Sequence, residues 1–459
     1  MKTLANKKGN LGIVLTEGPI MKTLLVFAIP IVLTNLLQQF YSMFDLMIAG
    51  QFIGNIGTVG VNTGGEIVDL VTPIAMGFST AGQIFIAQLV GRRDETRTKK
   101  TIGTLFSFMM IVSISLGALT IVFSKSLLGI LNCPEEAFGQ ARSYMIITAL
   151  GMPFIFGYNA VVGILRGMGE SRRPLIFILV ATIINVVLDL VLVVFFRLEA
   201  AGTAIATVLS QFGSFIASLV FLSRRKEKFG FSISRSFFSL DKEVLWVLVK
   251  LGIPQVVRSS LVRLSMLWCN ATANSYGMVV SATNSIGNKL QKFLEVFVQG
   301  VDTASASMVG QNLGARKTDR AGKVTLYTLA ATLTCAAIVS CLCIFIPKQL
   351  FSVFSTDAAV KDLGSVYLRI MIVHFIVSAT IGAYQAMVTG SGFVSLGFAI
   401  GIIDGVVCKI GLSYLLIYVF NLGYIGLFWG IACSRIIPCI ICMVYYYSGK
   451  WRTRKLLVD

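Results

Sequence analysis

The stretch INVVLDLVLVV, residues 184–194, places one carboxylate, Asp189, inside a run of valine, leucine and isoleucine. The surrounding segment 174–196 contains no other charged residue. It is therefore long and apolar enough to cross a bilayer as a helix of about 20 residues. A carboxylate at such depth costs ~2.5–3.5 kcal/mol on insertion scales. Asp189 thus indicates a polar interior and is a candidate functional residue.

The composition of the whole chain agrees with a membrane protein. Of its 459 residues, 56% are hydrophobic and 13% are charged, and the mean hydropathy is +0.82. A soluble domain has about 25% charged residues. The sequence predicts an all-α integral membrane protein with twelve transmembrane helices over 22–47, 60–86, 101–123, 141–164, 174–196, 201–223, 244–270, 279–308, 323–346, 364–388, 394–419 and 424–447.

The basic residues predict the orientation. The net charge is +18, and lysine and arginine gather in the connections after the second, fourth, sixth and eighth spans. These residues are Arg92, Arg93, Arg97, Lys99 and Lys100; Arg166, Arg172 and Arg173; Arg224, Arg225, Lys226 and Lys228; and Arg316, Lys317, Arg320 and Lys323. The positive-inside rule predicts a multi-pass protein of the cell (plasma) membrane with both termini in the cytoplasm. This alternation argues against nucleic acid as a partner.

The two halves of the sequence resemble each other at a spacing of 223 to 224 residues. FAIPIVL (27–33) matches LGIPQVV (251–257), AQLVGRRDE matches GQNLGARKT, and RGMGES matches TGSGFV. In addition, Gly202 and Ser210 recur as Gly426 and Ser434. Several matches in the same order indicate an internal duplication.

An even number of spans in each half makes the repeats parallel, as in secondary transporters whose two bundles rock against each other. We expect a cytoplasmic segment over 1–20, an N-lobe of six helices over 21–223 and a cytoplasmic linker over 224–243. A C-lobe of six helices over 244–448 and a cytoplasmic tail over 449–459 follow.

Three motifs together resemble the multidrug and toxic compound extrusion (MATE) family over nearly the whole chain. They are the paired QxxG turns at Gln88 and Gln311, the segment LRGMGESRRPL (165–175) and the segment NVVLD (185–189). The resemblance implies two six-helix lobes around a central cavity. It further implies a secondary active antiporter that exports small organic solutes, drugs or metabolites, in exchange for protons or sodium, by rocking-bundle alternating access. No cofactor other than the coupling ion is implied.

The resemblance also implies a coupling-ion site. In one branch of the family, an aspartate of the first span binds the ion together with an asparagine and an aspartate of the fifth span. A threonine of the sixth span and a tyrosine of the fourth span assist. The matching positions in this chain are Asp45, Asn185, Asp189, Thr207 and Tyr144.

The residues themselves are consistent with such a site. Asp189 lies 16 residues beyond Arg173, or ~24 Å along a helix, and Asp45, Tyr144 and Thr207 are also expected in the outer half of the bilayer. Asn185 and Asp189 share one helix face because they are four residues apart. Carboxylate, amide and hydroxyl oxygens can hold a proton or bind sodium, so both ions stay open. The competing interpretation is a purely structural hydrogen bond at Asp189.

The second half carries more charges within its spans. Arg258, Glu295, His374, Asp404 and Arg435 are candidate residues of a substrate cavity. We expect them to form a polar, partly cationic region that favours anionic or zwitterionic solutes. Structural ion pairing, with Arg258 facing Glu295, is the alternative.

Three other classes of function are alternatives to an antiporter: a flippase, a non-transporting membrane protein and an enzyme. A flippase for lipid-linked saccharides, or for other lipids, can have the same two-lobed architecture. A non-transporting receptor or scaffold leaves Asp45 and Asp189 unexplained. We do not expect an enzyme, because no connection is long enough to form a soluble catalytic domain. Twelve spans form a complete transport unit, so we expect a monomer.

Overall fold

The computed structural model describes residues 12–229, 238 and 240–459. These residues form helices and connections, and no strand occurs among them. Most of the predicted N-terminal segment 1–20 and part of the predicted linker 224–243, namely 230–237 and 239, lie outside the described residues.

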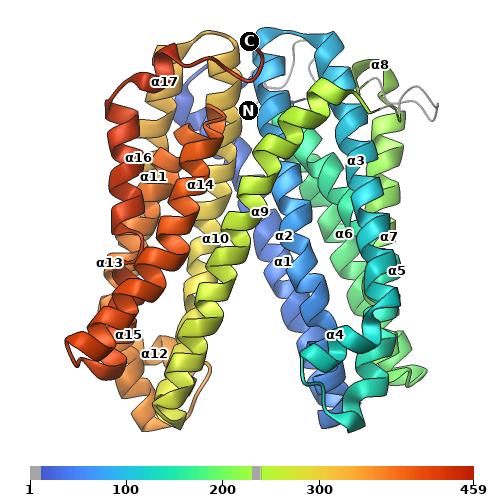
Figure 1. Ribbon diagram of the computed structural model, residues 1–459, viewed down its shortest axis with the longest axis vertical. Helices are drawn as coiled ribbons and strands as arrows, with labels where there is room; N and C mark the ends of the chain where they lie inside the picture. Colours follow the sequence, from blue (N-terminus) through green and yellow to red (C-terminus); the bar gives the residue numbers. More distant parts are fainter. Residues whose placement is uncertain (1–11, 230–237, 239) are drawn as a thin grey trace. The chain divides into compact units, whose positions relative to one another are not determined.

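The chain forms two compact units. The first unit consists of Met1–Gly12 and Leu33–Ile253, and the second consists of Ile13–Val32 and Pro254–Asp459. Two helices, α1 (Ile20–Ile48) and α9 (Lys242–Ser275), are therefore divided between the units (Figure 1). Each unit is described below by itself.

The first unit is built around α5 (Glu135–Gly167), which packs against α2 (Gly54–Arg92), α3 (Glu95–Val122) and α7 (Glu199–Ser223). The remaining elements are the end of α1, the π-helix η1 (Ala49–Ile53), α4 (Ser124–Ile130), α6 (Arg172–Asp189), the π-helix η2 (Leu190–Phe195), α8 (Lys226–Phe229) and the start of α9.

The second unit is built in the same way around α13 (Ala358–Gly390), which packs against α10 (Met278–Gly314), α11 (Thr318–Phe345) and α16 (Ile436–Tyr447). Its other elements are α12 (Pro347–Ser352), α14 (Val394–Ile402), the π-helices η3 (Ile403–Leu412) and η4 (Leu415–Val419), α15 (Gly423–Cys433) and α17 (Lys450–Thr453), besides the remainder of α9 and the start of α1.

All twelve stretches predicted from the sequence coincide with helices, apart from the last residue of three stretches and a break at Ser434 and Arg435 in the twelfth. Ten helical stretches of the described residues are long and apolar enough to cross a membrane. One of them, Ile20–Arg92, contains two predicted spans, because α1, η1 and α2 follow one another without a break. The helix α10 is not among the ten and carries four charged residues over the predicted span, Lys289, Lys292, Glu295 and Asp302.

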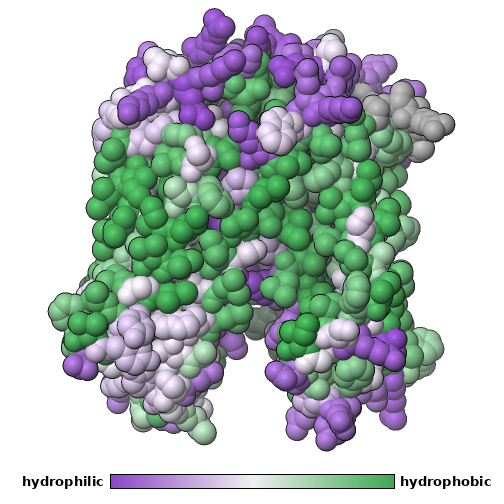
Figure 2. Space-filling model, viewed as in Figure 1, coloured by the Kyte–Doolittle hydropathy of each residue, from purple (hydrophilic) through white to green (hydrophobic). Residues whose placement is uncertain are grey.

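The surface is typical of a membrane protein. Leucine, isoleucine, valine and phenylalanine side chains are exposed along the helices, for example Ile114, Ile183, Leu264 and Ile440. In each unit hydrophobic residues cover the middle of the visible face, and hydrophilic residues gather at the helix ends (Figure 2). Lipid is the solvent that such side chains suit.

The duplication is visible in the backbone. Gly169 and Gly392, from the matched motifs RGMGES and TGSGFV, both have positive φ, 84° and 70°. Two residues earlier, a Cβ on Gly167 would lie 2.6 Å from the carbonyl oxygen of Gln83, and one on Gly390 would lie 2.8 Å from that of Ala306. Only glycine fits at such close helix contacts, so the same tight packing occurs in both units. The predicted repeat of two helical lobes is confirmed.

Candidate functional site

The carboxylates predicted to bind an ion lie on two helices of the first unit. Asp45 is on α1, one turn before η1, and Asp189 is the last residue of α6, where η2 begins. A π-helix widens the turn and changes the direction of the side chains beside it, and such segments are frequent at functional sites. Both aspartates therefore lie next to irregular helical backbone.

The structure brings the predicted residues of the first unit together. The carboxyl group of Asp45 is close to the side chains of Asp189, Asn185 and Thr207. Asn185 and Asp189 are completely buried. Asn185 lies one turn before Asp189 on α6, as the spacing of four residues predicts.

The polar atoms of this cluster are buried without hydrogen-bond partners among the described residues. They are Oδ1 of Asp45, both amide atoms of Asn185, both carboxyl oxygens of Asp189 and Oγ1 of Thr207. Buried polar groups are normally paired, because an unmet hydrogen bond costs ~1–3 kcal/mol. Such atoms are able to hold a proton or a small cation.

No basic residue compensates these carboxylates. The sequence has no lysine or arginine over 23–91 or over 174–196, which include most of α1, α2 and α6. Within the described part of the chain, neither Asp45 nor Asp189 forms an ion pair. The cluster thus has two carboxyl groups and no fixed positive charge.

Two tyrosines complete the surroundings. Tyr144 of α5 is buried, is near enough to Asp45 and Asp189 to interact electrostatically, and packs with Val61 and Ala204. Tyr41, which the sequence analysis missed, is one turn before Asp45 on α1. Its hydroxyl lies 3.3 Å from Oγ of Ser210. Its position four residues before Asp45, on the same helix face, was the available signal.

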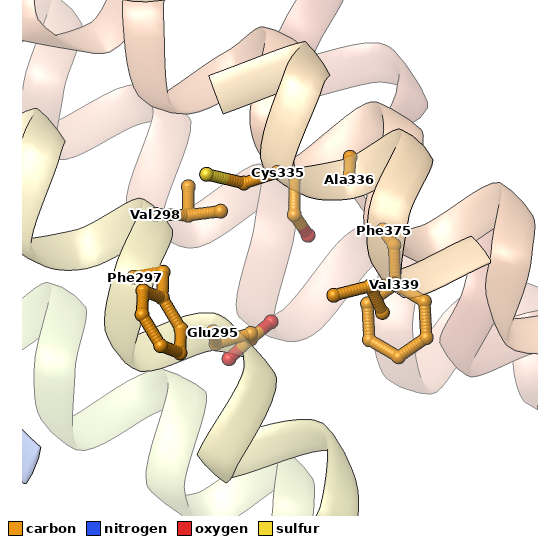
Figure 3. Close-up of a pocket in the computed structure, with 8 residues that line it drawn as sticks. Glu295, Phe297, Val298, Cys335, Ala336, Val339 and Phe375 are labelled. Atoms are coloured by element: carbon orange, nitrogen blue, oxygen red, sulfur yellow. The ribbon is translucent and has the colours of Figure 1, made fainter. Parts of the chain in front are cut away.

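The predicted residues of the second unit form a separate ionic network. Oε1 of Glu295 on α10 accepts a hydrogen bond from Nη1 of Arg435 at 2.8 Å and lies 2.7 Å from Nε2 of His374. Nη1 of Arg435 also donates to Oγ of Ser378 at 2.8 Å. Figure 3 shows Glu295 at a small pocket whose other walls are mostly apolar, among them Phe297, Val339 and Phe375.

The contacts of His374 fit the neutral imidazole. The ring is fully buried, and only its Nε2 has neighbours, Glu295 Oε1 and Gln291 Nε2 at 2.8 Å, whereas Nδ1 has no partner. A protonated ring would leave a buried N–H at Nδ1 without an acceptor. Nε2 therefore donates to Oε1 of Glu295, and Gln291 can accept from the ring only through its amide oxygen, not through the amide nitrogen. The histidine is thus a hydrogen-bonded member of the network.

The expected pairing of Arg258 with Glu295 is wrong. Glu295 is paired with Arg435 instead, and the charge that acts on Arg258 is that of Asp302, seven residues after Glu295 on α10. Sequence gives the depth of a residue in a span but not which helices are neighbours. Asp404 of η3 lies 3.8 Å from Nε of Arg435, through its Oδ2. Arg435 is thus held between two carboxylates, so the region is less cationic than expected.

A row of amide side chains along α10 was also missed. Asn284 and Asn288 both donate from Nδ2 to Oδ1 of Asn270 on α9, at 2.8 and 2.9 Å, and their own Oδ1 atoms have no partner in the described chain. Gln291 continues the row towards Glu295. The spacing of three to four residues places all of them on one face of the helix, which gives the second unit a polar interior.

The chemistry that these groups support is binding rather than bond making. Among the described residues no group of three or more histidine, cysteine, aspartate or glutamate side chains is arranged to hold a metal ion. The first unit offers carboxyl, amide and hydroxyl oxygens, which suit a proton or a hard monovalent cation. The second unit offers a charge-balanced network and amide groups.

Comparison with known proteins assigns the family. The MatE family profile matches twice, over residues 30–191 and 254–415. The chain belongs to the MatE family. Among its relatives are two Bacillus subtilis (strain 168) proteins, each described as a probable multidrug resistance protein. YpnP is 28% identical over 458 residues, covering 97% of this chain and 98% of YpnP, and YoeA is 24% identical over 447 residues, covering 96% of each chain.

Solved structures have the same fold. The outward-facing conformation of a multidrug resistance MATE family transporter of the MOP superfamily superposes with a TM-score of 0.90 at 21% identity, over 98% of this chain and all of that chain. Membership of the MatE family makes the protein a multi-pass membrane transporter and not an enzyme. The two matched segments are the two repeats recognised in the sequence.

Proposed function

We propose that the protein is a secondary active antiporter that exports small organic solutes in exchange for protons or sodium. The observation that carries the proposal is the cluster of Asp45 and Asp189, in which Oδ1 of Asp45 and both carboxyl oxygens of Asp189 are buried without a hydrogen-bond partner or a basic neighbour among the described residues. Two like charges at close range in a low-dielectric interior are unfavourable unless a proton or a cation is shared between them. The cluster is therefore suited to bind an ion and release it.

In this proposal Asp45, Asn185 and Asp189 bind the coupling ion directly. Thr207 adds a hydroxyl oxygen, and Tyr144 closes the cluster from α5. Alternating access follows from rocking of the two repeated units, as in other transporters built from internal repeats. Ion release when the solute binds then makes the exchange obligatory.

The polar interior of the second unit is the proposed region for solute recognition. Arg258, Glu295, His374, Asp404 and Arg435 line or support it. The positive charge of Arg435 is compensated by two carboxylates. The amide groups of α10 therefore contribute hydrogen bonds to solute recognition, in addition to the positive charge that we expected to select anionic or zwitterionic solutes.

The membrane location, the orientation and the oligomeric state are part of the same proposal. The basic connections favour a cell-membrane protein with both termini in the cytoplasm and argue against a nucleic-acid partner. Twelve spans form a complete transport unit, so the proposed active form is a monomer. A lipid flippase is less favoured, because the curated relatives are described as multidrug resistance and multidrug export proteins.

Transport into proteoliposomes tests the exchange. The probes are ethidium as a cation, rhodamine B as a zwitterion and carboxyfluorescein as an anion, under an imposed proton or sodium gradient. Gradient-driven movement of at least one probe supports an antiporter. Movement that is independent of both gradients, or scrambling of labelled phospholipid instead, contradicts it. Transport of ethidium alone, unaffected by Arg435→Ala or Arg258→Ala, contradicts the proposed solute preference.

A further inference from the structure

The position that matches the ion cluster has changed its charge in the second unit. The two matched segments, 30–191 and 254–415, are related by a spacing of 224 residues. At this spacing Asp45, Asn185 and Asp189 correspond to Cys269, Lys409 and Ser413. The second unit thus has a lysine, and neither aspartate, at the matched positions.

The structure supports this correspondence. In the first unit Asn185 on α6 lies close to Asp45 on α1. In the second unit Lys409 on η3 lies near enough to Cys269 on α9 for the two groups to interact electrostatically. Lys409 and Ser413 are buried like Asn185 and Asp189 on α6, and Cys269 is buried as well.

Lys409 is among the largest completely buried side chains of the described residues. An ammonium group is rarely buried without compensation, because removing it from water is costly. The charged groups that act on it are Asp404 on the same element, Glu295 of α10 and Arg435 at the break between α15 and α16. Of these, Arg435 already shares its guanidinium between Glu295 and Asp404.

The charges of the two clusters balance differently. In the second unit Arg435 pairs with both carboxylates, Glu295 and Asp404, and Lys409 lies near enough to both to interact with them electrostatically, while His374 is neutral. In the first unit Asp45 and Asp189 face no basic group. The second cluster is therefore neutral by its own residues, and the first becomes neutral only when a proton or a cation enters.

We propose that the ammonium group of Lys409 is a tethered cation, which fills in the second unit the place that the coupling ion takes in the first. One ion site of the duplicated fold is then permanently occupied, and only the first unit responds to the ion gradient. This inference rests on the proposed function, because it takes the first cluster as the ion site. It predicts that removing the ammonium opens a site for a small monovalent cation.

The test is cation-dependent thermal unfolding of Lys409→Met in detergent. Both it and its parent carry Asp189→Asn, so that the response of the first unit is removed. With choline as the only monovalent cation, we expect Lys409→Met to lower Tm by about 5 °C or more. The guanidinium of Arg435 is then the only positive group that compensates the carboxylates of Glu295 and Asp404. Methylammonium or sodium at constant ionic strength should restore about half of the loss or more.

The matched control is Lys292→Met, which removes an exposed lysine from α10. It should change Tm little and show no preference among the cations. If Lys409→Met is as stable as its parent in choline, or if its loss is the same in every salt, the proposal is overturned. The same holds if Lys292→Met responds like Lys409→Met, because the effect is then general surface electrostatics.

A compensating variant covers the case in which Lys409→Met does not fold. Lys409→Met combined with Asp404→Asn leaves Glu295 paired with Arg435 one to one, so it should fold, regain Tm and lose the cation response. Failure of the double variant to recover contradicts the proposal. Proton release from the otherwise unmodified protein, described below, tests the first cluster separately, so failure of one proposal is distinguishable from failure of the other.

Discussion

Asp45 on α1 and Asp189 at the end of α6 lie next to each other in the first unit, and neither forms an ion pair within the described part of the chain. Desolvation and the neighbouring carboxylate both disfavour two charged groups at this place. The sequence supplies no lysine or arginine over 174–196 to relieve it. We therefore expect the stability of this part of the fold to depend strongly on the proton or cation that binds to the two carboxyl groups.

Removal of the Glu295 carboxylate should lower the stability of the second unit. Glu295→Ala leaves Arg435 with only the more distant Asp404 and removes the acceptor of His374. Breaking a buried ion pair on one side typically costs ~3–5 kcal/mol. We expect a clear loss of free energy of unfolding, measured by thermal or chemical denaturation in detergent.

The control for this experiment is an exposed ion pair of the same unit. Asp362→Asn removes the partner of Lys348, and both side chains of that pair are more than 60% exposed. Such pairs contribute ~0–1 kcal/mol. Equal losses for Glu295→Ala and Asp362→Asn would show that the buried network contributes nothing beyond a surface contact.

Close helix packing makes a second prediction. A Cβ on Gly163 of α5 would lie 2.5 Å from the carbonyl oxygen of Ser79 on α2. Gly163→Ala should therefore force the two helices apart and destabilise the first unit by ~1–3 kcal/mol. Gly139, also in α5, has nothing within 4 Å of such a Cβ, so Gly139→Ala should be neutral or stabilise by up to ~1 kcal/mol. The reverse order of stabilities would contradict this packing.

The start of α9 makes a prediction about pH. Oδ1 of Asp241 accepts hydrogen bonds from the backbone N–H groups of Val244 and Glu243, both at 3.1 Å, and Oδ2 lies 3.5 Å from Nζ of Lys100. The bond from Val244, with the charge of Lys100, holds the pKa of the Asp241 carboxyl below its ordinary value.

A lowered pKa means that the ionised carboxyl stabilises the folded state. The contribution is complete above the ordinary aspartate pKa of ~3.9 and is lost as the pH falls through the lower value of the folded state. Asp241→Ala should cost ~1 kcal/mol near neutral pH, as for other helix caps, and clearly less at a pH below both values, where Asp241 is an uncharged cap. A cost that stays constant over this range would show that the charge is irrelevant. Asp241→Asn, which keeps the cap without the charge, is the control.

The sequence was sufficient for the helical architecture and for the repeat. The twelve apolar stretches all became helices, and the matched glycines 169 and 392 adopt the same left-handed backbone. Asn185 and Asp189 could be placed on one face from their spacing alone, and the family resemblance added Asp45, Thr207 and Tyr144, which the structure brings near them. Their role as an ion site stays a prediction.

The ionic network of the second unit could not be predicted in the same way. Depth along a helix suggested that Arg258 faces Glu295, but the choice between Arg258 and Arg435 depends on which helices are adjacent and how each is rotated. The break at Ser434 and Arg435 between α15 and α16, and the π-helix that contains Asp404 and Lys409, redirect these side chains. The break at Ser434 does have a signal in the sequence, because Pro438 has no N–H to donate to the carbonyl of Ser434 four residues earlier. No proline marks the start of the π-helix.

The central claim is that the buried carboxylates of the first unit carry the coupling ion. The most direct measurement is proton release by the purified protein on addition of ethidium, rhodamine B or carboxyfluorescein, with and without sodium, for the wild type, Asp189→Asn and Asp45→Asn. Release by the wild type that is lost in both variants, while each variant still folds, is the predicted result for a proton. Sodium-dependent binding that is lost in both variants is the predicted result for sodium. Ion-linked binding that survives in both variants would contradict the claim.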